Sequence, residues 1–408
     1  MIHRPGLGSA RLILPAVGLL TCGLAATVVE AQTPPATRPV ESAFSPDVHG
    51  DRTVTFRLRV LKATSVRLVG GDLPGNGGGT ELTKGEDGVW SATFGPVPGG
   101  AYRYHFAVDH QDFNGLEVAD PANPLTSQSN GTVWSLANVP GDARSDRADV
   151  PHGAVAEVFY RSTSLGQDRR MHVYTPPGYE AGTDRYPVLY LLHGASDSDD
   201  SWTTVGRANW IVDNAIAAGT AVPMIVVMPN GHAGPTPFVR AERGSLEREI
   251  DGLTTDLLND IQPLIDARYR TVADRDHRAV AGLSMGGGQT IQLAVTAPER
   301  FAYYGVFSSG VFGITGDPRF STTGPTWAER HKEVLAGDKL KQGVKLFWMA
   351  IGKEDFLLDT HRATVALFEK HGLPIEVQET ARGHVWLEWR DYLAEFVPRL
   401  FQPGPSEK

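Results

Sequence analysis

The feature that most constrains the fold of this chain is a regular alternation of apolar strands with helices in its second part. Two predicted strands, VLYLL at 188–192 and MIVVM at 224–228, are apolar at every position. Such strands suit a parallel sheet that is covered on both faces. Strands that alternate with helices indicate a doubly wound α/β fold. We therefore expect an α/β domain over residues 153–402.

The predicted elements of this domain continue the alternation toward the end of the chain. The strands are 154–160, 171–175, 188–192, 224–228, 278–281, 303–307, 345–351 and 375–379. The helices are 205–218, 247–269, 285–297, 326–336, 359–371 and 385–400. No helix separates the first two strands, so we expect these two strands to pair antiparallel.

The residues before this domain follow a different pattern. Short segments alternate apolar and polar residues, which is typical of half-buried strands; they are 53–60, 66–69, 88–94, 101–108 and 132–136. Turn-forming Pro and Gly residues separate the segments. Short strands at this spacing predict a small all-β sandwich over residues 41–140. The polar segment 141–152 is expected to link the sandwich to the α/β domain.

Aromatic residues of the predicted sandwich allow two interpretations. Trp90, Trp134, Tyr102 and Tyr104 are of the kind that stacks on sugars. Tyr102, Tyr104 and Phe106, however, lie two residues apart and share one face of their strand, as core residues do. The alternation favours the core interpretation.

The N-terminus has the layout of a secretory signal peptide. Arg4 and Arg11 precede an uncharged apolar run over 12–29, and a small-residue cleavage site follows. This pattern predicts a signal peptide at 1–31, a linker at 32–40, and a secreted or periplasmic protein. A single membrane anchor is the alternative, because the length of the run is borderline for spanning a bilayer.

Composition excludes several classes of protein. The chain has 408 residues, with 38 Lys+Arg against 47 Asp+Glu, a net charge of −9, and no basic run. Nucleic-acid-binding proteins need clustered basic residues, so no nucleic-acid partner is expected. The single cysteine, Cys22, excludes a disulfide scaffold and a thiolate zinc site.

The motif Gly282-Leu283-Ser284-Met285-Gly286 is the one G-x-S-x-G in the chain. It follows the predicted strand 278–281 and opens the predicted helix 285–297. A nucleophile elbow requires this strand–turn–helix context, in which small neighbours permit the tight turn. We therefore predict Ser284 as a catalytic nucleophile.

A serine nucleophile needs a base, which must be selected from 13 histidines. His384 lies beyond the predicted strand 375–379, at the end of a strand where ligands bind in open sheets. His232, in the loop after 224–228, is a weaker alternative. His361 and His371 fall in a predicted helix, and His277 precedes a strand.

The acid that orients the base should lie between the serine and the histidine, beyond another strand. Asp355 follows the predicted strand 345–351 and is our choice. Glu354 and Asp359 are alternatives, because only the loop and the order are predicted. Asp355 could instead cap the next helix.

The oxyanion hole needs two backbone donors. We expect the N–H of Met285, which follows the nucleophile, and the N–H of Ala195, in the loop after 188–192. His193 is expected to brace that loop. Chemistry of this kind requires no metal and no organic cofactor.

Further residues lie close to the predicted site along the sequence. Asp197, Asp199 and Asp200 do not have the spacing of a calcium loop, so we expect solvated acids there. Trp202 and Trp386 flank the site in sequence. They are expected to line a pocket for an aromatic acyl group or to pack in the core.

Taken together, these motifs resemble the esterase D superfamily, and within it the feruloyl esterases of carbohydrate esterase family 1. The segments that carry the resemblance are YLLHG at 190–194, GRANWIVDN at 206–214, VMPNG at 227–231, AGLSMGGGQT at 281–290, IGKEDF at 351–356 and RGHVWLEW at 382–389. The resemblance implies an α/β-hydrolase fold with Ser284, Asp355 and His384 as the triad. It also implies feruloyl or acetyl esters of xylan side chains as substrates.

The front segments SPDVHGDRTVTFRLR, GVWSATFGPVPGGAYRYHFAVD and DPANP resemble the early-set immunoglobulin-like domain found next to family 48 carbohydrate-binding modules. Such a domain precedes several esterases of this group. We expect it to place polymeric substrate against the site. The alternative is that it forms a wall of the active site or covers apolar surface on the hydrolase domain.

The sequence thus predicts a secreted serine carboxylesterase whose substrate is an ester on a carbohydrate or a small aromatic acid. The alternatives are an acyltransferase of the mycolyltransferase type and a siderophore (enterochelin-like) esterase. A non-catalytic carbohydrate-binding protein is a more remote one. No membrane partner is expected after signal cleavage, and the oligomeric state is left open.

Overall fold

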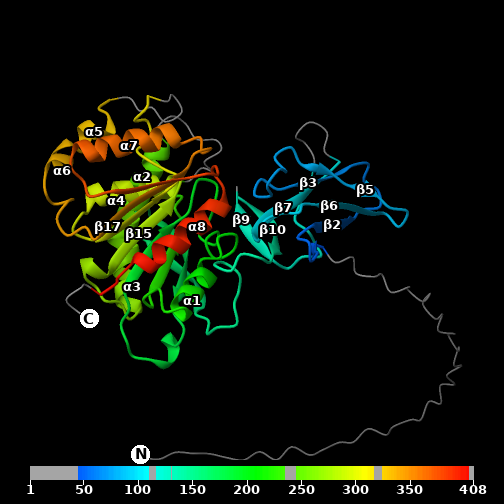
Figure 1. Ribbon diagram of the computed structural model, residues 1–408, viewed down its shortest axis with the longest axis horizontal. Coiled ribbons are helices and arrows are strands. Elements are labelled where there is room, and N and C mark those ends of the chain that lie inside the picture. Colours follow the sequence, from blue (N-terminus) through cyan, green and yellow to red (C-terminus); the bar gives the residue numbers. More distant parts are fainter. Residues whose placement is uncertain (1–44, 110–115, 130, 235–244, 317–323, 404–408) are drawn as a thin grey trace, which may run out of the picture. The chain divides into compact units, whose positions relative to one another are not determined.

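The computed structural model describes residues 45–109, 116–129, 131–234, 245–316 and 324–403. The predicted signal peptide with Cys22 and the predicted linker at 32–40 lie outside these residues. Two antiparallel sheets occupy the first part of the described chain, and one mostly parallel sheet with helices occupies the rest (Figure 1).

The mostly parallel sheet has eight strands in the order β11-β12-β14-β13-β15-β16-β17-β18. Their bounds are β11 Ala154–Ser162, β12 Gln167–Thr175, β13 Val188–Leu192, β14 Ile225–Pro229, β15 Arg278–Leu283, β16 Tyr303–Phe307, β17 Leu346–Gly352 and β18 Glu376–Thr380. β11 and β12 pair antiparallel, as predicted, and β12 also runs antiparallel to β14. The other pairs are parallel. The predicted doubly wound α/β class is therefore confirmed.

Helices cover both faces of this sheet (Figure 1). The α-helices are α1 Ala208–Ala217, α2 Ser245–Asp256, α3 Gln262–Arg268, α4 Met285–Thr296, α5 Trp327–Arg330, α6 Lys332–Ala336, α7 Leu358–Lys370 and α8 Trp386–Phe396. Short 3₁₀ turns are Tyr179–Ala181, Arg275–His277 and Val397–Arg399. Leu189 and Leu191 of β13 pack in the cluster that contains α1 and α8. Val188, Tyr190 and Leu192 pack in the cluster on the other face, with α2, α3 and α4.

Two predicted helices are divided in the structure. The prediction 247–269 covers α2 and α3, which a π-helical stretch at Leu257–Ile261 separates. The prediction 326–336 covers α5 and α6, which meet at His331. Among the described residues, no helix is long and apolar enough to cross a membrane.

The front region is built from two antiparallel sheets with a shared core. One sheet has the order β1-β2-β6-β5, and the other has the order β4-β3-β7-β10-β9, with β8 paired to β7. The bounds are β1 Asp47–Val48, β2 Val54–Arg59, β3 Val66–Val69, β4 Thr80–Glu81, β5 Thr83–Lys84, β6 Val89–Phe94, β7 Gly100–Val108, β8 Leu116–Val118, β9 Thr126–Ser129 and β10 Thr132–Val139. The five predicted strands are present, and the short β1, β4, β5, β8 and β9 are additional. Tyr102, Tyr104 and Phe106 are buried in the shared core, so the core interpretation of these aromatics is confirmed.

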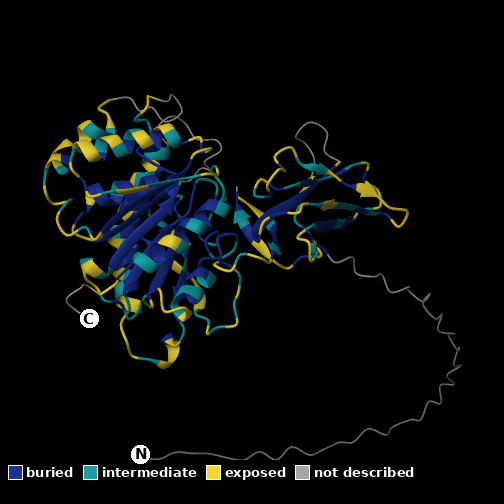
Figure 2. Ribbon diagram, in the orientation of Figure 1, coloured by how far each residue is buried: buried dark blue, intermediate teal, exposed yellow. Residues whose placement is uncertain are grey.

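Strand β7 is buried along its whole length (Figure 2). The tyrosine face packs inside the front region, whereas Ala101 on the other face belongs to the buried cluster of α1 and α8. Arg390 of α8 donates a hydrogen bond to the carbonyl of Ala101 at 3.2 Å, and Arg207 donates to the carbonyl of Gly100 at 2.9 Å. The front region therefore packs directly on the α/β region.

The predicted linker 141–152 is held against α1. Asp146 accepts a hydrogen bond from Arg207 at 2.7 Å, and its carbonyl accepts one from Asn214 at 2.8 Å. His152 Nδ1 lies 2.9 Å from the buried carboxylate of Asp213. These contacts tie the segment to the surface of the α/β region.

Candidate active site

Ser284 occupies the turn between β15 and α4, with backbone angles φ 50° and ψ −116°. A non-glycine residue rarely adopts a positive φ, so the surrounding structure must hold it there. A Cβ on Gly286 would lie 2.6 Å from the carbonyl oxygens of Leu192 and His193, and one on Gly282 would collide with the backbone of Gly286. Only glycine fits at both places. The turn thus has the geometry of a nucleophile elbow, which presents the serine hydroxyl above the sheet.

His384 and Asp355 meet beyond the ends of β18 and β17. His384 Nδ1 lies 2.8 Å from Asp355 Oδ2, and the Asp355 side chain is fully buried. The other carboxylate oxygen of Asp355 accepts a hydrogen bond from the Leu357 N–H at 2.9 Å. A carboxylate at Nδ1 holds the proton there and leaves Nε2 as the basic nitrogen. The alternative acids Glu354 and Asp359 are exposed.

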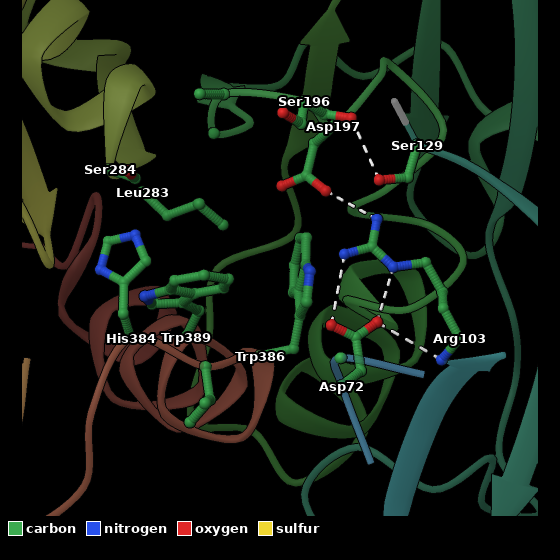
Figure 3. A pocket seen from close by; sticks show the side chains of 14 residues that line it. Asp72, Arg103, Ser129, Ser196, Asp197, Leu283, Ser284, His384, Trp386 and Trp389 are labelled. Carbon is green, nitrogen blue, oxygen red and sulfur yellow. Dashed lines mark hydrogen bonds and ion pairs between the residues drawn. The ribbon is translucent and has the colours of Figure 1, made fainter. Parts of the chain in front are cut away.

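One pocket contains Ser284 and His384 (Figure 3). Its lining residues are Gly71, Asp72, Arg103, Ser129, Gly194, Ala195, Ser196, Asp197, Leu283, Ser284, His384, Val385, Trp386 and Trp389. The first four belong to the front region. The sequence did not predict any of these four, because they lie far from the motifs along the chain.

Of the two predicted oxyanion donors, one lines this pocket and the other directly follows Ser284. Ala195 lines it, and Met285 is the first residue of α4. The first N–H groups of a helix have no acceptor within the helix, so the Met285 N–H is free to donate to a ligand oxygen. The same N-terminus favours negative charge through the helix dipole. The oxyanion roles of the Ala195 and Met285 N–H groups stay predictions.

His193 is buried behind this loop. Its Nε2 accepts a hydrogen bond from the Gly231 N–H at 2.7 Å, and its Nδ1–H donates to the Gly194 carbonyl at 2.8 Å. Burial lowers the pKa of His193, which keeps the ring neutral and Nε2 an acceptor. The ring thus ties the loop of Ala195 to the loop that follows β14.

The other histidines do not line the pocket. Burial lowers the pKa of His232 to about 4, and its ring lies 5.3 Å from that of His193. His361 Nδ1 lies 2.9 Å from the carbonyl oxygen of Ser309. Of the histidines weighed from the sequence, the structure brings only His384 together with Ser284.

Tryptophans of α8 build the apolar wall of the pocket. Trp386 and Trp389 pack edge to face at 5.2 Å, and Trp389 packs the same way on His384 at 4.9 Å. Trp202 is buried 5.1 Å behind Trp386 and supports it rather than lining the pocket. Trp389 was not predicted, although the i, i+3 spacing in WLEW places both helix tryptophans on one face.

The expected solvated acids of the loop after β13 are instead bound by partners. Asp197 is buried and accepts a hydrogen bond from Arg103 at 2.7 Å. Asp199 is buried between Arg170 and His172, at 2.7 and 2.8 Å. Asp200 accepts from the Gln128 N–H at 3.0 Å. The expectation was wrong because three acids on one tight loop need strong partners when the loop is covered.

Comparison with known proteins identifies the family of the chain. The family model "Putative esterase" matches residues 162–400. The chain belongs to this esterase family. It is 32% identical over 371 residues to the endo-1,4-beta-xylanase/feruloyl esterase of Xylanibacter ruminicola. That alignment covers 88% of this chain and 46% of the relative, so the chain spans less than half of the relative's length.

Solved structures of esterases share the fold of this family member. The CE1 ferulic acid esterase of Anaeromyces mucronatus in complex with ferulic acid has a TM-score of 0.55 at 20% identity, covering 64% of this chain and 96% of that one. The enterobactin esterase of Shigella flexneri in the presence of enterobactin has a TM-score of 0.59 at 18% identity, covering 86% of this chain and 93% of that one. The α/β region therefore has the α/β-hydrolase fold that the motifs implied.

Proposed function

We propose that this protein is a serine carboxylesterase that hydrolyses feruloyl or related aromatic acyl esters through an acyl-enzyme. The observation that carries the proposal is that the strained Ser284 and His384 line one pocket with an aromatic wall, and that His384 is paired with buried Asp355. Other histidine–aspartate pairs, such as His172–Asp199, and another serine with positive φ, Ser308, occur in the described residues, so neither feature identifies the site by itself. Their coincidence in one pocket is what hydrolytic acyl transfer requires.

In the proposed mechanism, Ser284 Oγ attacks the ester carbonyl carbon while His384 Nε2 accepts the hydroxyl proton. Asp355 holds the imidazole in the productive tautomer and stabilises the imidazolium. The N–H groups of Ala195 and Met285 donate to the oxyanion of the tetrahedral intermediate. The alcohol leaves with the proton from His384. Water then attacks the acyl-enzyme carbonyl carbon while His384 accepts its proton. Collapse of this second tetrahedral intermediate releases the acid, and His384 returns the proton to Ser284 Oγ.

The nature of the acyl group follows from the wall of the pocket. Trp386 and Trp389 line the pocket beside His384, although each is more than nine-tenths buried, and an apolar aromatic lining of this kind suits an aromatic ring. Phe356, whose side chain is 60% exposed, lies with its ring 4.5 Å from that of His384 at the outer side. The name of the Xylanibacter relative points in the same direction. An ester on xylan, an exported protein and a front domain that contacts carbohydrate are part of the proposal.

A siderophore-type ester is the second candidate. The enterobactin esterase structure matches 86% of this chain, against 64% for the ferulic acid esterase. The pocket, however, presents two carboxylates, Asp72 and Asp197, against the one guanidinium of Arg103. This balance favours a neutral phenolic ester over a catecholate with several negative charges.

A substrate panel tests the proposal. The full chain is assayed with methyl ferulate, an acetylated xylan oligosaccharide and enterobactin, with and without an added sugar alcohol as acyl acceptor. We expect the highest kcat/KM with methyl ferulate and hydrolysis in preference to transfer. A fluorophosphonate should label Ser284 in the wild type and leave Ser284→Ala unlabelled. Absence of both hydrolysis and labelling would refute an esterase.

A further inference from the structure

The loop that carries Ala195 is held from the front region. Gly194 to Asp197 form a turn closed by a hydrogen bond from the Asp197 N–H to the Gly194 carbonyl at 3.2 Å. Ser196 in this turn has φ 70°, a conformation that glycine or asparagine normally supplies. A turn with serine at this position needs external contacts to keep its shape. The orientation of the Ala195 N–H depends on that shape.

Two side chains of the front region make these contacts. Arg103 of β7 donates from Nη1 to Asp197 Oδ1 at 2.7 Å. Ser129 of β9 donates from Oγ to the Ser196 carbonyl at 3.1 Å. Ser129 and Arg103 are both more than nine-tenths buried. The turn is thus bound at two consecutive residues directly after Ala195.

Arg103 is itself fixed in place. Its Nε donates to Asp72 Oδ2 at 2.6 Å, so two carboxylates grip opposite sides of the guanidinium. The guanidinium also lies 5.8 Å from the centre of the Trp386 ring (Figure 3). Because Asp72 and Asp197 both bind the guanidinium, the positive charge of Arg103 is balanced and its orientation is fixed. Arg103 is therefore not available to bind an anionic substrate.

We propose that the front β-region is part of the catalytic apparatus, because Arg103 and Ser129 are positioning residues that aim the Ala195 N–H at the developing oxyanion. The inference rests on the proposed esterase function and deepens it. It assigns to the front region a role in the chemical step with small esters, in addition to any contact with long substrates. Such a role predicts an effect on kcat, because the oxyanion forms only in the transition state.

The test measures kcat and KM on methyl ferulate with full-length variants. Arg103→Met should lower kcat about 10- to 100-fold with KM changed less than about 3-fold, since losing one oxyanion donor outright costs about 10²–10³. The rate of fluorophosphonate labelling should fall by a similar factor, because that reaction uses the same donors. Ser129→Ala should lower kcat by a smaller factor, about 3- to 10-fold. Arg103→Lys should restore part of the loss.

Controls separate positioning from folding. Arg103→Met leaves the buried Asp197 and the partly buried Asp72 without their cation, so a variant that also carries Asp72→Asn and Asp197→Asn removes the stranded charges. It should fold and still show the loss in kcat. Arg67→Met is the matched control, because Arg67 on neighbouring β3 forms a comparable but exposed pair with Glu81. Its kinetics should equal those of the wild type.

The outcomes distinguish the two proposals. Normal kcat and labelling rate in the folded triple variant and in Ser129→Ala would overturn the positioning role alone. A raised KM at normal kcat would also overturn it, because Arg103 would then contact the substrate directly. Failure of the wild type to hydrolyse esters or to label at Ser284 would instead refute the proposed function.

Discussion

The two regions of this molecule bury their strands in different ways. In the α/β region, central strands such as β13 are covered on both faces by helices of the same region. In the front region, β7 buries its tyrosine face in its own core and the face with Ala101 and Arg103 against the α/β region. The groups proposed to perform the chemistry, Ser284, Asp355 and His384, thus follow strands of the α/β sheet, whereas the turn after Ala195 accepts hydrogen bonds from the front region. One site can thus combine groups from one region that are proposed to react with groups from another region that keep a loop of the site in place.

The substitution expected to lower kcat most lies in the α/β region. Ser284→Ala should reduce kcat roughly 10⁶-fold, because the covalent route disappears and only binding and the oxyanion hole remain. Steady-state hydrolysis of methyl ferulate measures the loss, and a thermal melt confirms the fold. Near-normal turnover with a native melt would mean that the reacting group lies elsewhere.

The second-largest loss in kcat is expected for Asp355, the predicted acid of the triad in the same region. Asp355→Asn should reduce kcat about 10⁴-fold, because the amide favours the wrong imidazole tautomer. Glu354→Gln and Asp359→Asn are the matched controls, since both side chains are exposed in the same segment. If either control is the crippling change, the acid has been assigned to the wrong residue.

Removal of the front region tests whether the α/β region can hydrolyse small esters by itself. A domain that only places polymeric substrate would leave small-ester activity unchanged when residues 32–140 are deleted. The pocket residues Asp72, Arg103 and Ser129 argue for the alternative, in which the front region forms a wall of the site. We expect the truncated protein to lose methyl ferulate hydrolysis about as much as xylan-ester hydrolysis, or to aggregate through the uncovered cluster of Trp202 and α8. A soluble truncation with full small-ester activity would restore the placement role.

The smallest expected change concerns Asp199, in the loop after β13, which Arg170 and His172 of the α/β region bind. Burial raises the pKa of Asp199, but hydrogen bonds from His172 and Arg170 outweigh it and lower the pKa from 3.8 to about 2. A depressed pKa contributes stability above about pH 4, and that contribution is lost as the pH falls toward 2. At 1.36 kcal/mol per unit, it amounts to about 2 kcal/mol.

Urea unfolding of Asp199→Asn and the wild type at pH 7 and pH 2.5 measures this contribution. The difference in unfolding free energy should be about 2 kcal/mol or more at pH 7 and should shrink at pH 2.5. Asp168→Asn is the control, because its pair with Arg161 is exposed and should contribute little. A difference between Asp199→Asn and the wild type that is independent of pH would argue against an ionised Asp199.

Prediction from sequence succeeded where the signal is local. β13 and β16 have the predicted bounds, because fully apolar runs between turn signals leave little choice of strand. The two-residue strands β4 and β5 were missed, because they are too short to show any periodicity. Trp389 was overlooked, although its spacing from Trp386 was visible.

Local spacing and apolar pattern are sufficient to predict the α/β class, the elbow at Ser284 and the strand ends that carry Asp355 and His384. The pairing of His384 with Asp355 rather than Glu354, and the presence of Arg103 in the pocket, became visible only in the folded chain. Arg103 and Asp197 are 94 residues apart, and nothing in the pattern around either predicts the other. An alternating strand shows which residues share a face, but what covers that face depends on how distant segments pack.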